Sequence, residues 1–166
     1  MKRIIFISTI SISLIFCLLQ AIKYVAPGSY PFAEIYEFNS NEKQLIDLVE
    51  NFKKNNPQYN VPMNNLFDGR KDSNDYWFHV YLYYPNENEL IYFWIRQSSS
   101  SSEKTEIGLV SINEGLILGN WKEVNDKFSR SENREIKKKF EERVLNKLGL
   151  EYKDEGNGMK IGFIQI

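Results

Sequence analysis

The sequence is short of the residues from which metal sites and nucleophilic sites are built. Its 166 residues include one cysteine, Cys17, and one histidine, His79. Zinc needs several sulfur or nitrogen ligands, and a disulfide within the chain needs a second cysteine. No spacing supplies His79 with a nucleophile and an orienting carboxylate, so we interpret it as a structural residue. We therefore expect no metal, no cofactor and no catalytic residues.

The sequence also lacks an excess of positive charge. Lys and Arg total 21, Asp and Glu total 22, and three of the basic residues (Lys2, Arg3 and Lys23) flank the N-terminal apolar run. A protein that binds nucleic acid needs a basic stripe to engage the phosphates. We therefore expect no nucleic-acid partner. The oxygen-rich stretch 68–75 lacks the spacing of an EF-hand, and we interpret it as a solvated turn.

One long apolar run is present, at residues 4–22, and it contains no charged residue. A helix of this length rises about 28 Å, close to the hydrocarbon thickness of a bilayer. Lys2 and Arg3 precede the run and only Lys23 follows it closely, a bias that keeps the N-terminus in the cytoplasm. Residues 1–23 are thus predicted to form a transmembrane or signal helix. The abundance of Asn, Lys, Ile and Ser is typical of an AT-rich bacterial genome, so we expect this helix in the inner membrane of a bacterial cell envelope.

Three kinds of processing fit this segment. It can be retained as a signal-anchor, which we favour because the run exceeds the usual signal core of roughly 7–15 residues. It can be cleaved after Ala21, or the chain can be lipidated at Cys17, although Phe16 is bulky where a lipid-transfer signal expects a small residue. All three place the remaining chain outside the cytoplasm, in the periplasm or beyond.

The next segment, residues 24–38, is predicted to be a tether, because it contains Pro27, Gly28 and Pro31, and to run into a short strand at 34–38. The folded domain is expected over residues 39–166. Its first helix should begin at the N-cap Asn39, with Glu42 completing a capping box. The helix should end at residues 55–57, because proline cannot continue a helix.

The clearest element is a β-hairpin with arms at residues 76–84 and 89–97. Both arms are rich in aromatic and β-branched residues that alternate with period two. We predict a register that pairs Leu82 with Ile91. A slip by one residue would move the apolar side chains of one arm to the other face.

The later elements are less regular. We predict a mobile loop at the serine tract 98–102, a strand at 105–113, a short helix at 120–128, a longer helix from about Ser131 to Leu148, and a final strand at 159–166. Consecutive strands joined by short turns form antiparallel sheets, and helices can cover one face of such a sheet. The predicted fold is therefore a two-layer α+β domain with four to five antiparallel strands and two or three helices on one face.

The hairpin has a second face whose side chains combine large apolar bodies with polar tips, a composition enriched at contact surfaces. We call it the aromatic face, and we predict that a partner binds there. Aromatic pairs between strands also stabilise a half-exposed sheet, and loops can cover them, so a purely structural role is the alternative. The residues of the aromatic face are Trp77, His79, Tyr81, Tyr83, Tyr92, Trp94 and Arg96.

The sequence favours a non-enzymatic binding module of the cell envelope whose aromatic face contacts a protein. A narrower version is an immunity or inhibitor protein that blocks a toxin or a hydrolase. The alternative is a hydrolase of glycan or peptidoglycan, which would need two carboxylates roughly 5–9 Å apart beside Trp77 or Trp94. A third hypothesis is a structural subunit whose anchor packs against membrane partners.

Overall fold

The computed structural model describes residues 30–62, 65–154 and 158–161. The predicted anchor 4–22 with Cys17, the tether up to residue 29 and the last five residues of the predicted final strand lie outside them. Phe32–Ile166 forms one compact unit, so the folded domain begins before the boundary at residue 39 that the sequence suggested. Within the described ranges, no helix is long and apolar enough to cross a membrane.

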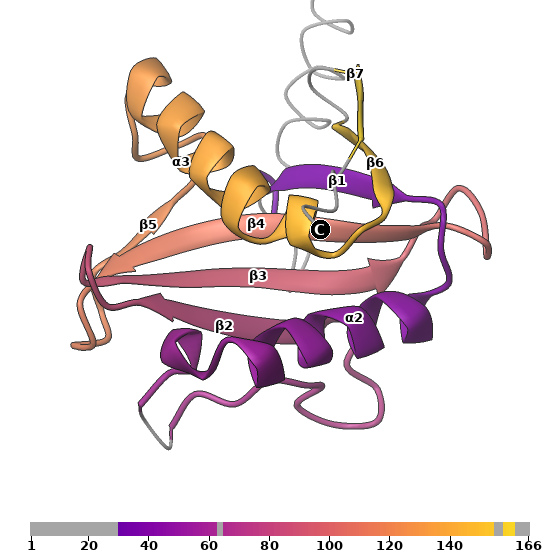
Figure 1. Cartoon of the computed structure of the whole chain (residues 1–166). Helices are drawn as coiled ribbons and strands as arrows, with labels where there is room; N and C mark the ends of the chain where they lie inside the picture. The colour runs from indigo at the N-terminus through magenta and orange to yellow at the C-terminus, as the bar shows by residue number, and fades with distance from the viewer. Residues whose placement is uncertain (1–29, 63–64, 155–157, 162–166) are drawn as a thin grey trace, which may run out of the picture. The chain divides into compact units, whose positions relative to one another are not determined.

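The domain is an α+β fold, as predicted. Its described residues form a seven-stranded antiparallel sheet, more than the four to five strands expected, with the order β2-β3-β4-β1-β6-β7 and β5 paired to β4 (Figure 1). The strands are β1 (Glu34–Phe38), β2 (Phe78–Tyr84), β3 (Glu89–Gln97), β4 (Thr105–Glu114), β5 (Trp121–Glu123), β6 (Glu151–Asp154) and β7 (Gly158–Ile161).

The predicted hairpin and its register are confirmed. β2 and β3 pair with Leu82 opposite Ile91, Tyr81 opposite Tyr92, and His79 opposite Trp94. The pairing of β3 with β4 shifts between Tyr92 and Phe93, a β-bulge that leaves one extra residue in β4. The bulge keeps the core side chains of both strands on one face.

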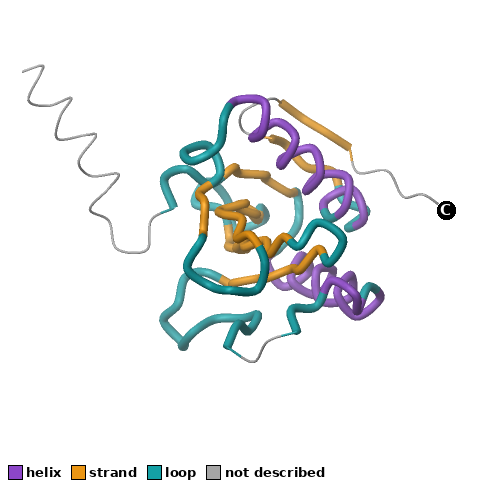
Figure 2. The backbone as a smooth tube through the Cα atoms, turned by 90° about the vertical axis from the view of Figure 1, so that its left-hand side faces the viewer, coloured by secondary structure: helices purple, strands orange, loops and turns teal. Residues whose placement is uncertain are grey.

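The two described α-helices lie on the same face of the sheet, as Figures 1 and 2 show. Helix α2 (Glu42–Asn55) begins at Asn41, whose side chain accepts from the Gln44 N–H, so the predicted N-cap Asn39 is wrong by two residues. Helix α3 (Arg130–Arg143) begins at Ser129, which forms a capping box with Glu132. Single turns of 3-10 helix follow them, η1 (Pro57–Tyr59) and η2 (Leu145–Lys147).

The core lies between the helices and the sheet. Leu45, Val49 and Phe52 come from α2, and Phe140 comes from α3 with its ring centroid 5.1 Å from that of Phe93. Alternate residues of the strands complete the same cluster: Tyr36, Phe38, Val80, Leu82, Tyr84, Ile91, Phe93, Ile95, Ile107, Leu109 and Ile112. Burial of this apolar surface fixes which face of each strand points away from the helices.

The predicted short helix at 120–128 is wrong. Trp121–Glu123 pairs with Ser111–Asn113 as strand β5, and a turn with Asn125 at a φ of 65° follows. The buried Asn113 fixes the preceding loop, because its amide donates to the carbonyls of Gly115 and Ile117 and accepts from the Asn120 N–H. These side-chain-to-backbone hydrogen bonds and the pairing of β5 with β4 outweigh the capping pattern of the sequence.

The serine tract is also different from the prediction, because it is hydrogen-bonded to the sheet. Ser98 is buried and its hydroxyl donates to Glu106, 2.8 Å away. The Ser100 hydroxyl donates to Glu37, which is paired with Lys104. The Lys104 hydrogen bond lowers the pKa of Glu37 and keeps this carboxylate ionised as an acceptor. Polar contacts therefore order the start of the tract in place of apolar ones.

Candidate functional site

The aromatic face is the face of the sheet opposite α2 and α3. Figure 2 shows both described α-helices on one side of the strands, whereas the described residues on the other side form loops. Residues of β2 and β3 that alternate with the core residues point to this side. Their rings form two clusters, one at each side of His79.

The first cluster surrounds Trp94. The ring centroids of Trp77 and Trp94 are 4.4 Å apart, and the guanidinium carbon of Arg96 lies 4.7 Å from the Trp77 centroid and 5.0 Å from that of Trp94. Tyr76 stands at the outer side, with its centroid 5.4 Å from the same guanidinium. Arg96 also donates to Glu106 at 2.9 Å. A cation held among three rings and paired with a carboxylate stabilises this end of the sheet.

The second cluster surrounds Tyr92. Tyr81 stacks on Tyr92 with a centroid separation of 4.9 Å. Trp121 of β5 lies 6.3 Å from Tyr81 and 6.2 Å from Tyr92, measured between ring centroids. Strand β5 brings Trp121 here because Asn113 pairs with Trp121 in the sheet. Trp121 therefore belongs to the aromatic face, although the sequence analysis placed this residue on a helix.

His79 joins the clusters to the preceding loop. Its Nε2 lies 3.0 Å from the Asp75 carboxylate and its Nδ1 lies 2.7 Å from the Tyr92 hydroxyl. An ionised carboxylate only accepts hydrogen bonds, so Nε2 carries the proton and Nδ1 accepts from Tyr92 in the neutral ring. Burial lowers the pKa of His79, and Asp75 opposes part of that shift. Both ring nitrogens are thus engaged.

Asp75 is the orienting carboxylate that sequence reasoning did not assign to His79. Burial by itself would raise the pKa of Asp75. Backbone N–H groups of Lys71 and Trp77 donate to its two oxygens, and together with His79 they lower the pKa. The stretch 68–75 is therefore a hydrogen-bonded turn, and not only a solvated one.

The loop before β2 also closes the outer edge of that strand. Gly69 and His79 exchange two backbone hydrogen bonds, at 2.8 and 2.9 Å. The Tyr81 N–H donates to Asp68 at 2.9 Å, and Lys53 donates to the Tyr81 carbonyl at 2.7 Å and pairs with Asp68. Edge strands with unpaired backbone groups invite pairing with other chains, and these contacts remove that opportunity over the middle of β2.

The predicted site residues differ in their exposure. His79, Tyr92 and Trp94 are 3, 8 and 1 % exposed, so the face covers them with its own side chains. Trp77, Tyr81, Tyr83 and Arg96 are half-buried and reach the surface. Two rings missed by the prediction add to the surface, Tyr76 at 52 % exposure and the half-buried Trp121. We call Tyr76, Trp77, Tyr81, Tyr83 and Trp121 the accessible rings.

The acidic groups bonded to this face are engaged in structural contacts. Asp75 holds His79 and two backbone N–H groups, whereas Glu106 holds Arg96 and Ser98. In the described part of the chain, no three His, Cys, Asp or Glu side chains are grouped so that they could hold a metal ion. The geometry therefore offers apolar and aromatic contact with few polar groups.

Comparison with known proteins adds no relative: no family model, no curated protein and no solved structure matches this chain.

Proposed function

We propose that this protein is a non-catalytic binding module of the bacterial cell envelope, and that its accessible rings contact a protein partner. In this proposal residues 4–22 anchor the chain in the inner membrane, and the folded domain lies in the periplasm or another space outside the cytoplasm. The observation that carries the proposal is the grouping of five partly exposed aromatic rings on the sheet face that carries neither described helix.

The make-up of the face supports a protein as the partner. Trp, Tyr and Arg are the residue types that dominate binding energy at protein interfaces. Trp and Tyr bury large areas at a low cost in conformational entropy, because each has only two side-chain torsions. Here the rings rest on a buried support of His79, Tyr92 and Trp94. Such support holds the accessible rings in place before the partner arrives, which lowers the entropy lost on binding.

A narrower proposal is an immunity or inhibitor protein that blocks a toxin or a hydrolase reaching the envelope. An inhibitor needs a rigid surface and no chemistry of its own. The aromatic face fits this requirement, because Tyr81 stacks on the buried Tyr92 and Glu106 holds Arg96 in place. The two acids bonded to the face, Asp75 and Glu106, are occupied by His79 and Arg96, which makes the glycan-hydrolase alternative less attractive.

The proposal is tested by capturing partners with the full chain from membranes of the organism that makes it. Tyr76→Ala with Trp121→Ala removes two accessible rings, and neither substitution breaks a hydrogen bond of the His79 network. The matched control is Asp47→Ala with Glu142→Ala, two exposed residues of α2 and α3. We expect the ring variant to lose the captured partner and the control to keep it. A partner retained by both variants, with circular dichroism showing that both are folded, would contradict the proposal.

A further inference from the structure

One edge of helix α3 is basic. Arg130, Arg134, Lys137 and Lys138 follow one another at helical spacing on one side of the helix. Together with Asn125, Phe128, Asn133 and Glu141 they line a cavity of about 650 Å³. That volume lies in the range of small-molecule sites, so a phosphate-bearing group can enter it between the basic side chains.

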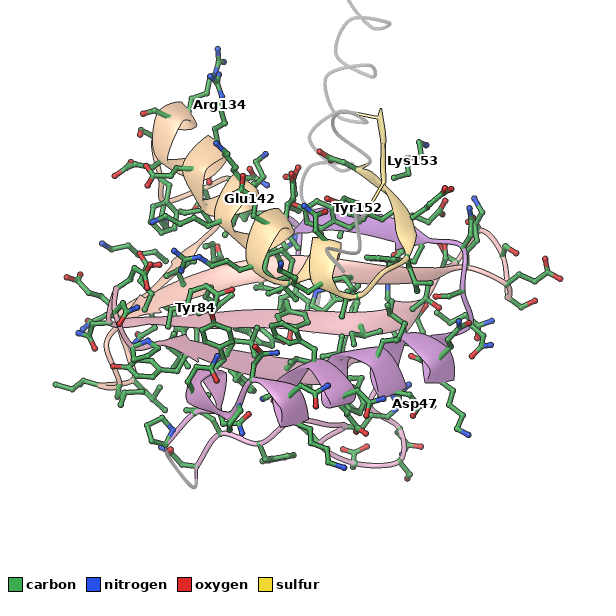
Figure 3. The ribbon with its side chains drawn as sticks, in the orientation of Figure 1. Asp47, Tyr84, Arg134, Glu142, Tyr152 and Lys153 are labelled. Carbon is green, nitrogen blue, oxygen red and sulfur yellow. The ribbon has the colours of Figure 1, made fainter. Side chains whose placement is uncertain are left out.

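The charges of this edge are only partly compensated. Lys137 pairs with Glu34 at 3.1 Å. Lys138 lies 3.8 Å from Glu142, and the side chains of Lys138 and Glu142 are largely exposed. Among the described residues, Arg130 and Arg134 form no ion pair, and both are exposed. Figure 3 shows Arg134 projecting from the beginning of α3, away from the sheet. Two arginines are therefore available for an anionic partner.

The same edge lies where the chain enters the domain. Asn125 donates to the Phe32 carbonyl at 3.0 Å and to the Glu34 carboxylate at 2.8 Å, and its own N–H donates to Asn133 of α3 at 2.8 Å. Asn125 and Asn133 both line the cavity. The first residues of the domain are thus fixed beside the basic edge of α3.

A short connection between this edge and the predicted anchor allows the basic edge to reach the membrane surface. The predicted anchor ends at residue 22, and a chain of the length of segment 23–31 spans at most about 30 Å when it is fully extended. A connection of this length lets the basic edge come within about a Debye length, roughly 10 Å, of the bilayer surface. At that distance each basic group is attracted to anionic lipids by a factor of roughly five in affinity. Such attraction favours an orientation in which a basic surface of the domain faces the bilayer, and the edge of α3 is such a surface.

We propose that Arg130, Arg134 and Lys138 contact anionic phospholipid headgroups of the membrane in which the chain is anchored. The inference rests on the proposed anchoring by residues 4–22, and it goes beyond the proposed function because it fixes how the domain stands on the bilayer. Helix α3 packs on the face of the sheet opposite the aromatic face, with Phe140 against Phe93. Contact at α3 therefore turns the β2–β3 part of the aromatic face away from the lipid and toward a partner.

The test uses the full chain in lipid nanodiscs. A fluorophore is attached through an unnatural amino acid at Ser131, which is exposed beside Arg130, and in a second sample at Asn86 in the hairpin turn. Quenching by lipids with spin-labelled headgroups reports proximity to the membrane. We expect the Ser131 probe to be quenched at least threefold more in discs with anionic phosphatidylglycerol than in neutral discs, and the Asn86 probe to be unaffected.

Two charge-reversal variants distinguish the effect of the basic edge on quenching from the effect of the protein's net charge. Arg130→Glu with Arg134→Glu should abolish the extra quenching. Residue 130 lies in the first turn of α3, where an acidic side chain is favourable, and both side chains are exposed. Lys43→Glu with Lys54→Glu changes the net charge equally on the exposed side of α2 and should leave the quenching intact. High salt should relieve the quenching, because it screens the attraction.

Equal quenching at Ser131 in anionic and neutral discs, or quenching that survives reversal of both arginines, would overturn the inference. A chain that does not enter the discs would overturn it as well, through loss of the anchor. None of these three results depends on the accessible rings, so partner capture tests the proposed contact with a protein separately.

Discussion

The indole of Trp94 lies over Gly108, its partner across the β3–β4 pair. A methyl group at position 108 would overlap Cζ2 and Cε2 of the indole. The absence of a side chain at Gly108 of β4 therefore makes room for the most deeply buried ring of the aromatic face, which is 1 % exposed. Trp77 then lies against the buried indole and not against the backbone of the sheet.

Gly108→Ala should destabilise the protein by about 1–3 kcal/mol, because the added methyl group displaces the indole or the strand. Urea unfolding of the purified full chain, followed by tryptophan fluorescence, measures the effect. Trp94→Phe removes the overlapping atoms, so the double variant should be more stable than the sum of the two single losses predicts. Strictly additive losses would show that the glycine is not needed for the indole.

Because His79 is buried, we predict that the free energy of unfolding decreases in mild acid. Burial lowers its pKa in the folded protein below the ordinary value of 6.5, so the unfolded chain takes up a proton first as the pH falls. The stabilisation is complete above pH 6.5 and decreases as the pH falls from there toward the folded pKa. Melting temperatures at several pH values from about 7.5 to 5.5 measure it.

His79→Gln is the control for this pH dependence. The variant should be less stable at neutral pH, since it changes the hydrogen bonds with Asp75 and Tyr92. Its melting temperature should fall less between those pH values than that of the unchanged chain. An identical pH dependence in the variant would assign the effect to other groups.

Removal of the Asp68 side chain should expose the edge of β2 to other chains. Asp68→Ala leaves the Tyr81 N–H without its acceptor and Lys53 without its ion pair, so the edge becomes open to pairing with another chain. Sedimentation velocity should show self-association of the variant at concentrations where the unchanged chain is monodisperse. Asp68→Asn keeps an acceptor oxygen and should associate less. Two variants that sediment like the unchanged chain would contradict this role.

The hairpin was predictable from the sequence because each arm is long enough for its alternation to define two faces. In β2 the apolar residues Val80 and Leu82 alternate with His79 and Tyr81, and only one register keeps both sets aligned with β3. Strand β1 and the end of α2 before Pro57 were predicted for similar local reasons. In these segments local preference and tertiary packing agree.

The remaining elements depend on contacts that local patterns do not record. The three residues of β5 are too few to show a period, and the Asn113 side chain decides the path before them. Strand β6 has four residues and pairs with β1, far away in the sequence. The Asp75–His79 contact depends on a turn closed by the hydrogen bond from the Asp75 N–H to the Asp72 carbonyl and on the bridge between Gly69 and His79.

Site-specific photo-crosslinking in the living cell tests contact at the accessible rings most directly. A benzophenone amino acid is placed at Tyr76 or Tyr81 in the full chain, and at Asp47 or Glu142 on the helix side as a control. We predict that one protein is crosslinked at both ring positions and at neither helix position. Crosslinking of that partner only from the helix positions would contradict the proposed role of the aromatic face.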